Sequence, residues 1–120
     1  MSKFPQEVRD KVAHRSQLRC EGCGGPGPLE LHHRQYRSRG GADSTVNALA
    51  LCGMGNVLGC HAVAHTAAGE ARGWSVRSRF DPATIPVEHA LLGCVYLCED
   101  GTTTAEIRQP VLSSTERKES

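Results

Sequence analysis

The chain has few of the features that stabilise a large apolar core. Only 4% of its 120 residues are aromatic, namely two Phe, two Tyr and one Trp. No apolar run approaches the roughly 20 residues of a membrane-spanning helix, and the first five residues lack the apolar stretch of a signal peptide. We therefore expect one small cytoplasmic domain, whose thin core needs a metal ion as a staple.

The charge has no large excess of one sign, since the formal net charge is +1. Its distribution is uneven. Residues 1–40 contain eight Lys and Arg against four Asp and Glu, residues 72–80 contain three Arg and no acid, and residues 81–120 contain three basic residues against seven acidic ones. Basic clusters of this kind bind phosphate backbones, although a solvated surface of mixed charge would have the same composition.

Apolar periodicity and turn residues divide the chain into short elements. Apolar residues at every fourth position predict a helix over 4–15. Alternation predicts a strand over 29–33, and the Ala-rich stretch 61–72 predicts a second helix that stops at Gly73. The other expected elements are a loop over 35–44, an apolar segment over 47–52, a strand over 74–76, a turn over 81–84, a hairpin over 90–107 with an Asp-Gly turn, and a loose tail over 113–120.

Four of the six cysteines are candidate ligands of a structural zinc ion, although the gap between Cys52 and Cys60 is longer than is usual for such a site. In a chain expected to be cytoplasmic, thiols favour metal ligands over disulfides. Cys20 and Cys23 are separated by two residues, as in one half of such a site. Cys52 and Cys60 can supply the other half across seven residues. The alternative is that this second pair consists of core thiols.

The other two cysteines lie in the expected C-terminal hairpin. Cys94 and Cys98 are four apart in an apolar stretch, and therefore on one face of a strand. We expect both to be buried free thiols; the alternative is a second metal site. The apolar residues of this hairpin could belong either to the core or to a surface that pairs two copies of the chain.

Four histidines have the spacing of metal ligands together with a base. His61 and His65 are four apart, which places both on one helical face as two ligands of one ion. His32 and His33 must point to opposite sides of a strand. One of them can then bind metal while the other acts as a base near neutral pH, as hydrolysis of a phosphodiester requires. The alternative is a second structural zinc site.

In this order, the motifs resemble the HNH endonuclease family. They are Cys20-Glu21-Gly22-Cys23, Leu29-Glu30-Leu31-His32-His33, Arg37-Ser38-Arg39-Gly40-Gly41-Ala42-Asp43, Asn47, Leu51-Cys52 and Cys60-His61. The stretch through Arg72-Gly73-Trp74 is similar to small HNH proteins encoded by bacteriophages, and the match covers about residues 9–76. The resemblance implies an α+β fold of the ββα-metal type, built on a treble-clef zinc knuckle. From the chain length we expect a single domain over 1–112.

The resemblance also implies a role for each site residue. His33 would be the general base, and Asn47 would brace the loop that orients it. His32, His61 and His65 would hold one catalytic divalent ion, which could be Mg²⁺, Mn²⁺, Ni²⁺ or Zn²⁺. Many relatives have Asp at the position of His32, so the all-imidazole ligand set of this chain shifts the preference towards softer ions. Many relatives also lack a counterpart of His65.

The expected partner is DNA, cut on one or both strands by a monomer or homodimer. Arg34, Arg37 and Arg39 directly follow the predicted catalytic strand, so we expect them to contact phosphates; the alternative is a solvated basic loop. By analogy with phage relatives, the enzyme would act beside terminase in genome packaging. The competing interpretations are a zinc-stabilised module that binds nucleic acid without cutting it, and a purely structural zinc protein. Neither needs His33.

Overall fold

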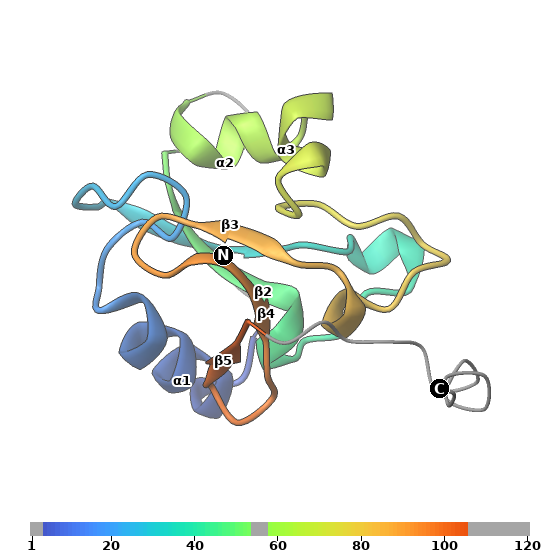
Figure 1. Cartoon of the computed structure of the whole chain (residues 1–120), viewed down its shortest axis with the longest axis horizontal. Helices are drawn as coiled ribbons and strands as arrows, with labels where there is room; N and C mark the ends of the chain where they lie inside the picture. Colours follow the sequence, from blue (N-terminus) through green and yellow to red (C-terminus); the bar gives the residue numbers. More distant parts are fainter. Residues whose placement is uncertain (1–3, 54–57, 106–120) are drawn as a thin grey trace.

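The computed structural model describes residues 4–53 and 58–105, which form two small antiparallel sheets with helices packed around them (Figure 1). One sheet pairs β1 with β2, and the other has the order β3-β4-β5. The fold is therefore of the expected α+β class. The elements are α1 (Gln6–Ser16), β1 (Leu29–His33), η1 (Arg37–Arg39), η2 (Thr45–Asn47), β2 (Ala48–Cys52), α2 (Gly59–Ala64), α3 (Ala67–Ala71), η3 (Pro82–Thr84), β3 (Val87–His89), β4 (Gly93–Leu97) and β5 (Thr103–Thr104).

Helix α1 forms where the four-residue apolar period predicted it. Pro5 caps the helix with φ −61°, the value that its ring imposes. Phe4, Val8 and Val12 are buried and pack against the β1–β2 sheet. The predicted helix over 4–15 is thus confirmed, with ends shifted by one or two residues.

The β1–β2 sheet separates two apolar clusters. Strand β2 is buried on both faces: its even-numbered alanines pack against α1, and Leu49 and Leu51 face the second cluster. In β1, Leu31 packs on the α1 side, while Leu29 at the start of the strand contacts both clusters. His32 therefore points to the opposite face, as alternation along the predicted strand requires.

The second cluster connects the cysteine-rich turn to the C-terminal sheet. Trp74 is 2% exposed and packs with Val87 of β3, Val95 and Leu97 of β4, and Leu49 and Leu51 of β2. A Cβ added to Gly22 would lie 2.8 Å from the Trp74 ring, so only glycine fits this turn. The indole Nε1–H donates to the carbonyl oxygen of Glu88 at 3.1 Å. Trp74 thus holds the cysteine-rich turn against the C-terminal sheet.

The single helix predicted over 61–72 is wrong, because two short helices occupy this stretch. Helix α2 ends at Ala64, and α3 begins at Ala67 after the cap residue Thr66, whose hydroxyl accepts from the amide of Gly69. A Cβ on Gly69 would lie 2.5 Å from the Ala64 Cα. This close approach folds α3 back onto α2.

The structure of the C-terminal region agrees only in part with the elements predicted from the sequence. The Asp100-Gly101 turn joins β4 and β5, and Gly101 has the positive φ that such a turn needs (92°). The strand expected over 74–76 is wrong, since that segment joins neither sheet of the described residues. The end of the hairpin beyond residue 105 and the predicted tail lie outside the described residues. None of the described helices is long and apolar enough to cross a membrane.

The expected burial of both C-terminal cysteines is wrong for Cys94. Val95 and Leu97 point into the core from β4, which leaves Cys94 exposed on the other face and Cys98 half-buried. The alternation was therefore offset by one residue. Neither cysteine forms a disulfide.

Candidate functional site

The turn after α1, the end of β2 and the start of α2 bring four thiols together. The sulfur atoms of Cys20, Cys23, Cys52 and Cys60 all lie within 4.8 Å of one another. Cys23 and Cys52 have their sulfur atoms 3.8 Å apart. That separation matches the edge of a tetrahedral site with Zn–S bonds of roughly 2.3 Å, which is about 3.8 Å. The four predicted ligands are thus grouped as a structural metal such as zinc requires.

The electrostatics of these thiols favour a bound cation. The amides of Gly22, Cys23 and Cys52 lie 3.3, 3.4 and 3.3 Å from the Cys20 sulfur. Burial alone would raise the pKa of the Cys20 thiol, but these hydrogen bonds outweigh burial and lower it. At Cys60, burial and then the neighbouring Cys20 raise the thiol pKa. A divalent cation would supply the positive charge that allows all four thiols to ionise.

Three imidazoles converge on the face of β1 that points away from α1. One ring nitrogen from each of His32, His61 and His65 lies within 4.8 Å of the others. His65 directly follows α2 as its cap residue, so the end of that helix leaves it stacked on His61 with the ring centroids 5.2 Å apart. Burial, followed by the charge of His61, lowers the pKa of His32 to about 3. Its ring is therefore neutral at physiological pH, which is the form that binds metal.

Two of these rings are oriented through their second nitrogen. The Nε2 of His32 lies 2.7 Å from the carbonyl oxygen of Trp74. Because a carbonyl only accepts, Nε2 carries the proton and Nδ1 keeps a lone pair for a metal. The Nδ1 of His61 donates in the same way to the carboxylate of Glu30 at 2.7 Å, which leaves Nε2. Such outer partners are usual for histidines that bind metal. Sequence analysis missed Glu30, although its position two residues before His32 on a strand gives both the same face.

His33 lines the same cavity as the three converging imidazoles. The cavity has a volume of about 250 Å³ and is lined by Leu31, His32, His33, Tyr36, Arg37, His61 and His65. The His33 ring stacks on Phe4, with the centroids 4.1 Å apart, and its Nε2 lies 2.8 Å from the carboxylate of Asp43. With Nε2–H donating to that carboxylate, Nδ1 is the nitrogen that can accept a proton. Asp43 was part of the recognised motif, but no role had been predicted for it.

Asn47 closes the loop between β1 and η2. The side chain is 1% exposed. Its Oδ1 accepts from the Gln35 amide at 2.7 Å, and its Nδ2 donates to the carbonyls of Gln35 and Ala42 at 3.0 and 2.9 Å. These bonds join the end of β1 to the segment that carries Asp43. The contacts are those expected of a residue that braces the loop around His33.

The three arginines predicted to contact phosphates have different positions. Arg37 and Arg39 are exposed on η1, and Arg37 lines the histidine cavity. The expectation for Arg34 is wrong, because its side chain is fully buried and donates to backbone carbonyls from three segments. Arg34 shares the inward face of His32, two residues earlier. It stabilises the core and has no access to DNA.

Comparison of the chain with protein-family models, curated proteins and solved structures gives no match. The resemblance to HNH endonucleases therefore depends on the motifs themselves. The geometry of the histidine cavity and of the cysteine cluster is the basis for assigning a function.

Proposed function

We propose that the chain is a metal-dependent HNH endonuclease that hydrolyses DNA phosphodiester bonds. One observation carries this proposal: three converging imidazoles share a cavity with His33, a fourth imidazole oriented by the carboxylate of Asp43. A purely structural metal site has no use for an oriented imidazole beside it. The succession β1, β2, α2, with ligands on β1 and α2, also suits the ββα-metal arrangement.

His32, His61 and His65 fit a divalent ion, since each offers one ring nitrogen within 4.8 Å of the others. Such an ion would supply positive charge to the scissile phosphate and to the leaving oxygen. Three protein ligands leave coordination positions open, as catalytic sites do. The all-imidazole set suits Zn²⁺ and Ni²⁺ beside the harder Mg²⁺ and Mn²⁺. The separate cysteine cluster would hold the structural zinc.

In this mechanism, Nδ1 of His33 takes a proton from a water molecule. The water oxygen forms a bond to phosphorus, the bond from phosphorus to the 3′ oxygen breaks, and the leaving oxygen gains a proton from solvent. Asp43 stabilises the imidazolium that forms, because its carboxylate already contacts Nε2. Arg37 reaches the same cavity and binds a phosphate oxygen. The products are a 5′ phosphate and a 3′ hydroxyl.

The test is a supercoiled-plasmid assay of wild type and His33→Ala with Mg²⁺, Mn²⁺, Ni²⁺, Zn²⁺ or EDTA. We expect nicking that EDTA abolishes and that the variant loses by at least about 100-fold, the usual contribution of a general base. The control is His14→Ala, which removes an exposed imidazole from α1. The zinc content and melting temperature of both variants should match wild type.

Two outcomes would contradict the proposal. Full activity in folded His33→Ala would remove His33 as the base. Absence of cleavage by folded wild type with every metal would leave the zinc-stabilised nucleic-acid-binding module as the better interpretation.

A further inference from the structure

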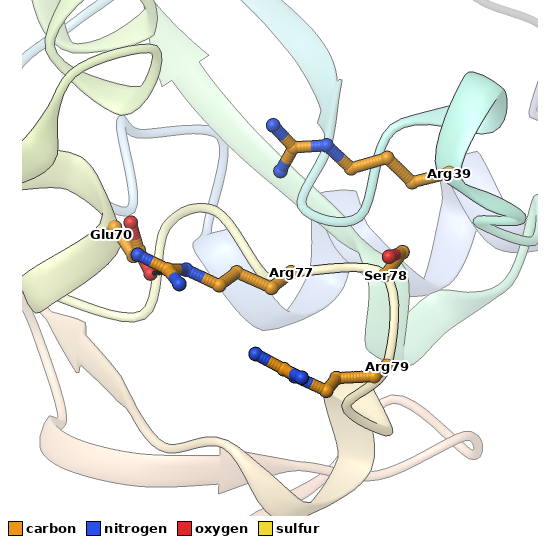
Figure 2. A pocket seen from close by; sticks show the side chains of 5 residues that line it. All are labelled: Arg39, Glu70, Arg77, Ser78 and Arg79. Atoms are coloured by element: carbon orange, nitrogen blue, oxygen red, sulfur yellow. Dashed lines mark hydrogen bonds and ion pairs between the residues drawn. The ribbon is translucent and has the colours of Figure 1, made fainter.

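A second hollow, which we call the arginine hollow, is lined by charged and polar side chains. Its volume is about 480 Å³, and Figure 2 shows three arginine side chains extending across it in the same direction, from η1 and from the segment after Val76. Among residues 4–53 and 58–105, no aliphatic or aromatic residue lines it, so it suits a charged ligand. The lining residues are Arg39, Glu70, Arg77, Ser78 and Arg79.

The hollow has a net positive charge, because three guanidinium groups face one carboxylate. The Nε of Arg77 lies 2.5 Å from Glu70, and the two side chains are 59% and 42% exposed. Exposed ion pairs are weak, so an anion can compete with Glu70 for Arg77. The other two guanidinium groups lie over aromatic rings: Arg39 is 4.5 Å from the Tyr36 ring centre and Arg79 is 5.8 Å from that of Phe80. Stacking on a ring face leaves the N–H edge of a guanidinium available to a ligand.

The arginine hollow lies next to the histidine cavity. Helix η1 contributes Arg37 to the histidine cavity and Arg39 to the hollow. The Tyr36 ring beneath Arg39 carries a hydroxyl that lies 2.8 Å from Nδ1 of His65. A polynucleotide with one phosphate at the histidines can therefore place a neighbouring phosphate in the arginine hollow.

We propose that the arginine hollow binds a backbone phosphate adjacent to the one that is cleaved. The inference rests on the proposed nuclease function and adds a substrate requirement. The enzyme needs a polynucleotide, because an isolated phosphodiester would occupy the histidine cavity and leave the arginine hollow empty. Guanidinium forks match phosphate oxygens, and the Ser78 hydroxyl adds a donor. Glu70 opposes this binding, because it occupies Arg77 and repels the phosphate.

The test compares two substrates in the working metal: duplex DNA, and bis(p-nitrophenyl) phosphate, which has a single phosphate. For Arg77→Gln/Arg79→Gln, we expect KM for the duplex to rise at least about 10-fold and the slope of log affinity against log salt to become shallower by about one to two. Hydrolysis of the small diester should be unchanged. Glu70→Gln should lower KM for the duplex, which is the opposite sign. The control is Arg9→Gln, which removes an exposed charge from α1.

Unchanged KM and salt slope in the double variant would overturn the arginine hollow while leaving the nuclease proposal intact. If the double variant does not fold, Arg79→Gln and Glu70→Gln give the same test with opposite signs. If wild type cleaves neither substrate, the nuclease proposal fails separately. Fluorescence anisotropy with labelled duplex then decides on the hollow: affinity lost in the double variant but kept in Arg9→Gln supports it, and equal affinities overturn it.

Discussion

Arg34 allows a test of the fold through the stability of the protein. Its guanidinium is fully buried, and burial lowers its pKa to about 9, so it remains charged at neutral pH. The variant Arg34→Met keeps the length of the side chain and removes every donor. The acceptors that lose their partner are the carbonyl oxygens of Val46, Gly73, Pro82 and Ile85, at 2.8, 2.9, 3.1 and 2.8 Å.

The expected loss of stability follows from these four contacts. Leaving a buried acceptor without a donor costs about 1–3 kcal/mol, but the substitution also relieves the cost of burying a charge. Breaking a buried charged network from one side usually costs about 3–5 kcal/mol, and we expect a value in that range. Since about 1 kcal/mol shifts the melting temperature of a domain of this size by roughly 4 °C, the melting temperature should fall by roughly 12–20 °C.

The measurement is thermal and urea unfolding followed by circular dichroism at constant zinc content, because bound metal also shifts the melting temperature. Arg37→Met is the matched control, since the side chain of Arg37 is exposed and its loss should change stability by about 0.5 kcal/mol or less. Arg34→Lys keeps the charge but replaces the planar fork with a single ammonium group. It should therefore recover less than half of the lost stability.

A contrary result would be an Arg34→Met protein that melts within about 2 °C of wild type and binds DNA more weakly. That combination would mean that the guanidinium faces the ligand, as the sequence first indicated. It would also mean that the carbonyl contacts contribute little to the fold.

Three further changes test other parts of the molecule. Cys20→Ser should lose the bound zinc and cooperative unfolding, measured by metal analysis and circular dichroism, because structural zinc contributes on the order of 10 kcal/mol in small domains. Asn47→Ala removes three hydrogen bonds and should destabilise the fold by about 2–3 kcal/mol in urea; plasmid cleavage at equal folded fraction should slow as well. Burial would raise the pKa of Glu21, but hydrogen bonds from Arg15 and His89 outweigh burial and lower it below 4.5. The unfolded state then takes up the proton first, so urea stability should fall as pH drops below about 4.5, and Glu21→Gln should lack this part of the pH dependence.

Local patterns predicted the parts of the fold whose cause is local. The alternation of β1 placed His32 and His33 on opposite sides of a strand with the bounds of the observed one. The predicted convergence of His61 and His65 does not need a longer helix. Helix α2 ends at Ala64, but His65 as its cap residue still lies about one turn after His61. The two-residue gap between Cys20 and Cys23 predicted half of a cluster, and the end of β2 and the start of α2 supply the other half.

The parts that failed depend on segments distant in sequence. Arg34 directly follows β1 in a segment with no apolar pattern, so the sequence indicated a surface residue. Only the packing of the chain from Gly73 to Ile85 over it makes it a core residue. The stretch divides into two helices at Thr66 because Gly69 packs closely against α2. Helical propensity along the sequence cannot predict such a contact. In the same way, Cys94 is exposed because Val95 meets the core formed by Trp74 and Val87.

The division of roles between His32 and His33 depends on register. A slip of β1 by one residue would exchange their faces, because side chains alternate along a strand. Two hydrogen bonds beyond the strand oppose that slip: the amide of Arg34 donates to the Asn47 carbonyl at 2.8 Å, and the amide of Gln35 donates to the Asn47 side chain at 2.7 Å. The buried guanidinium of Arg34 fixes the same point from the other side. A buried core residue thus helps to fix which histidine joins His61 and His65 and which one contacts Asp43.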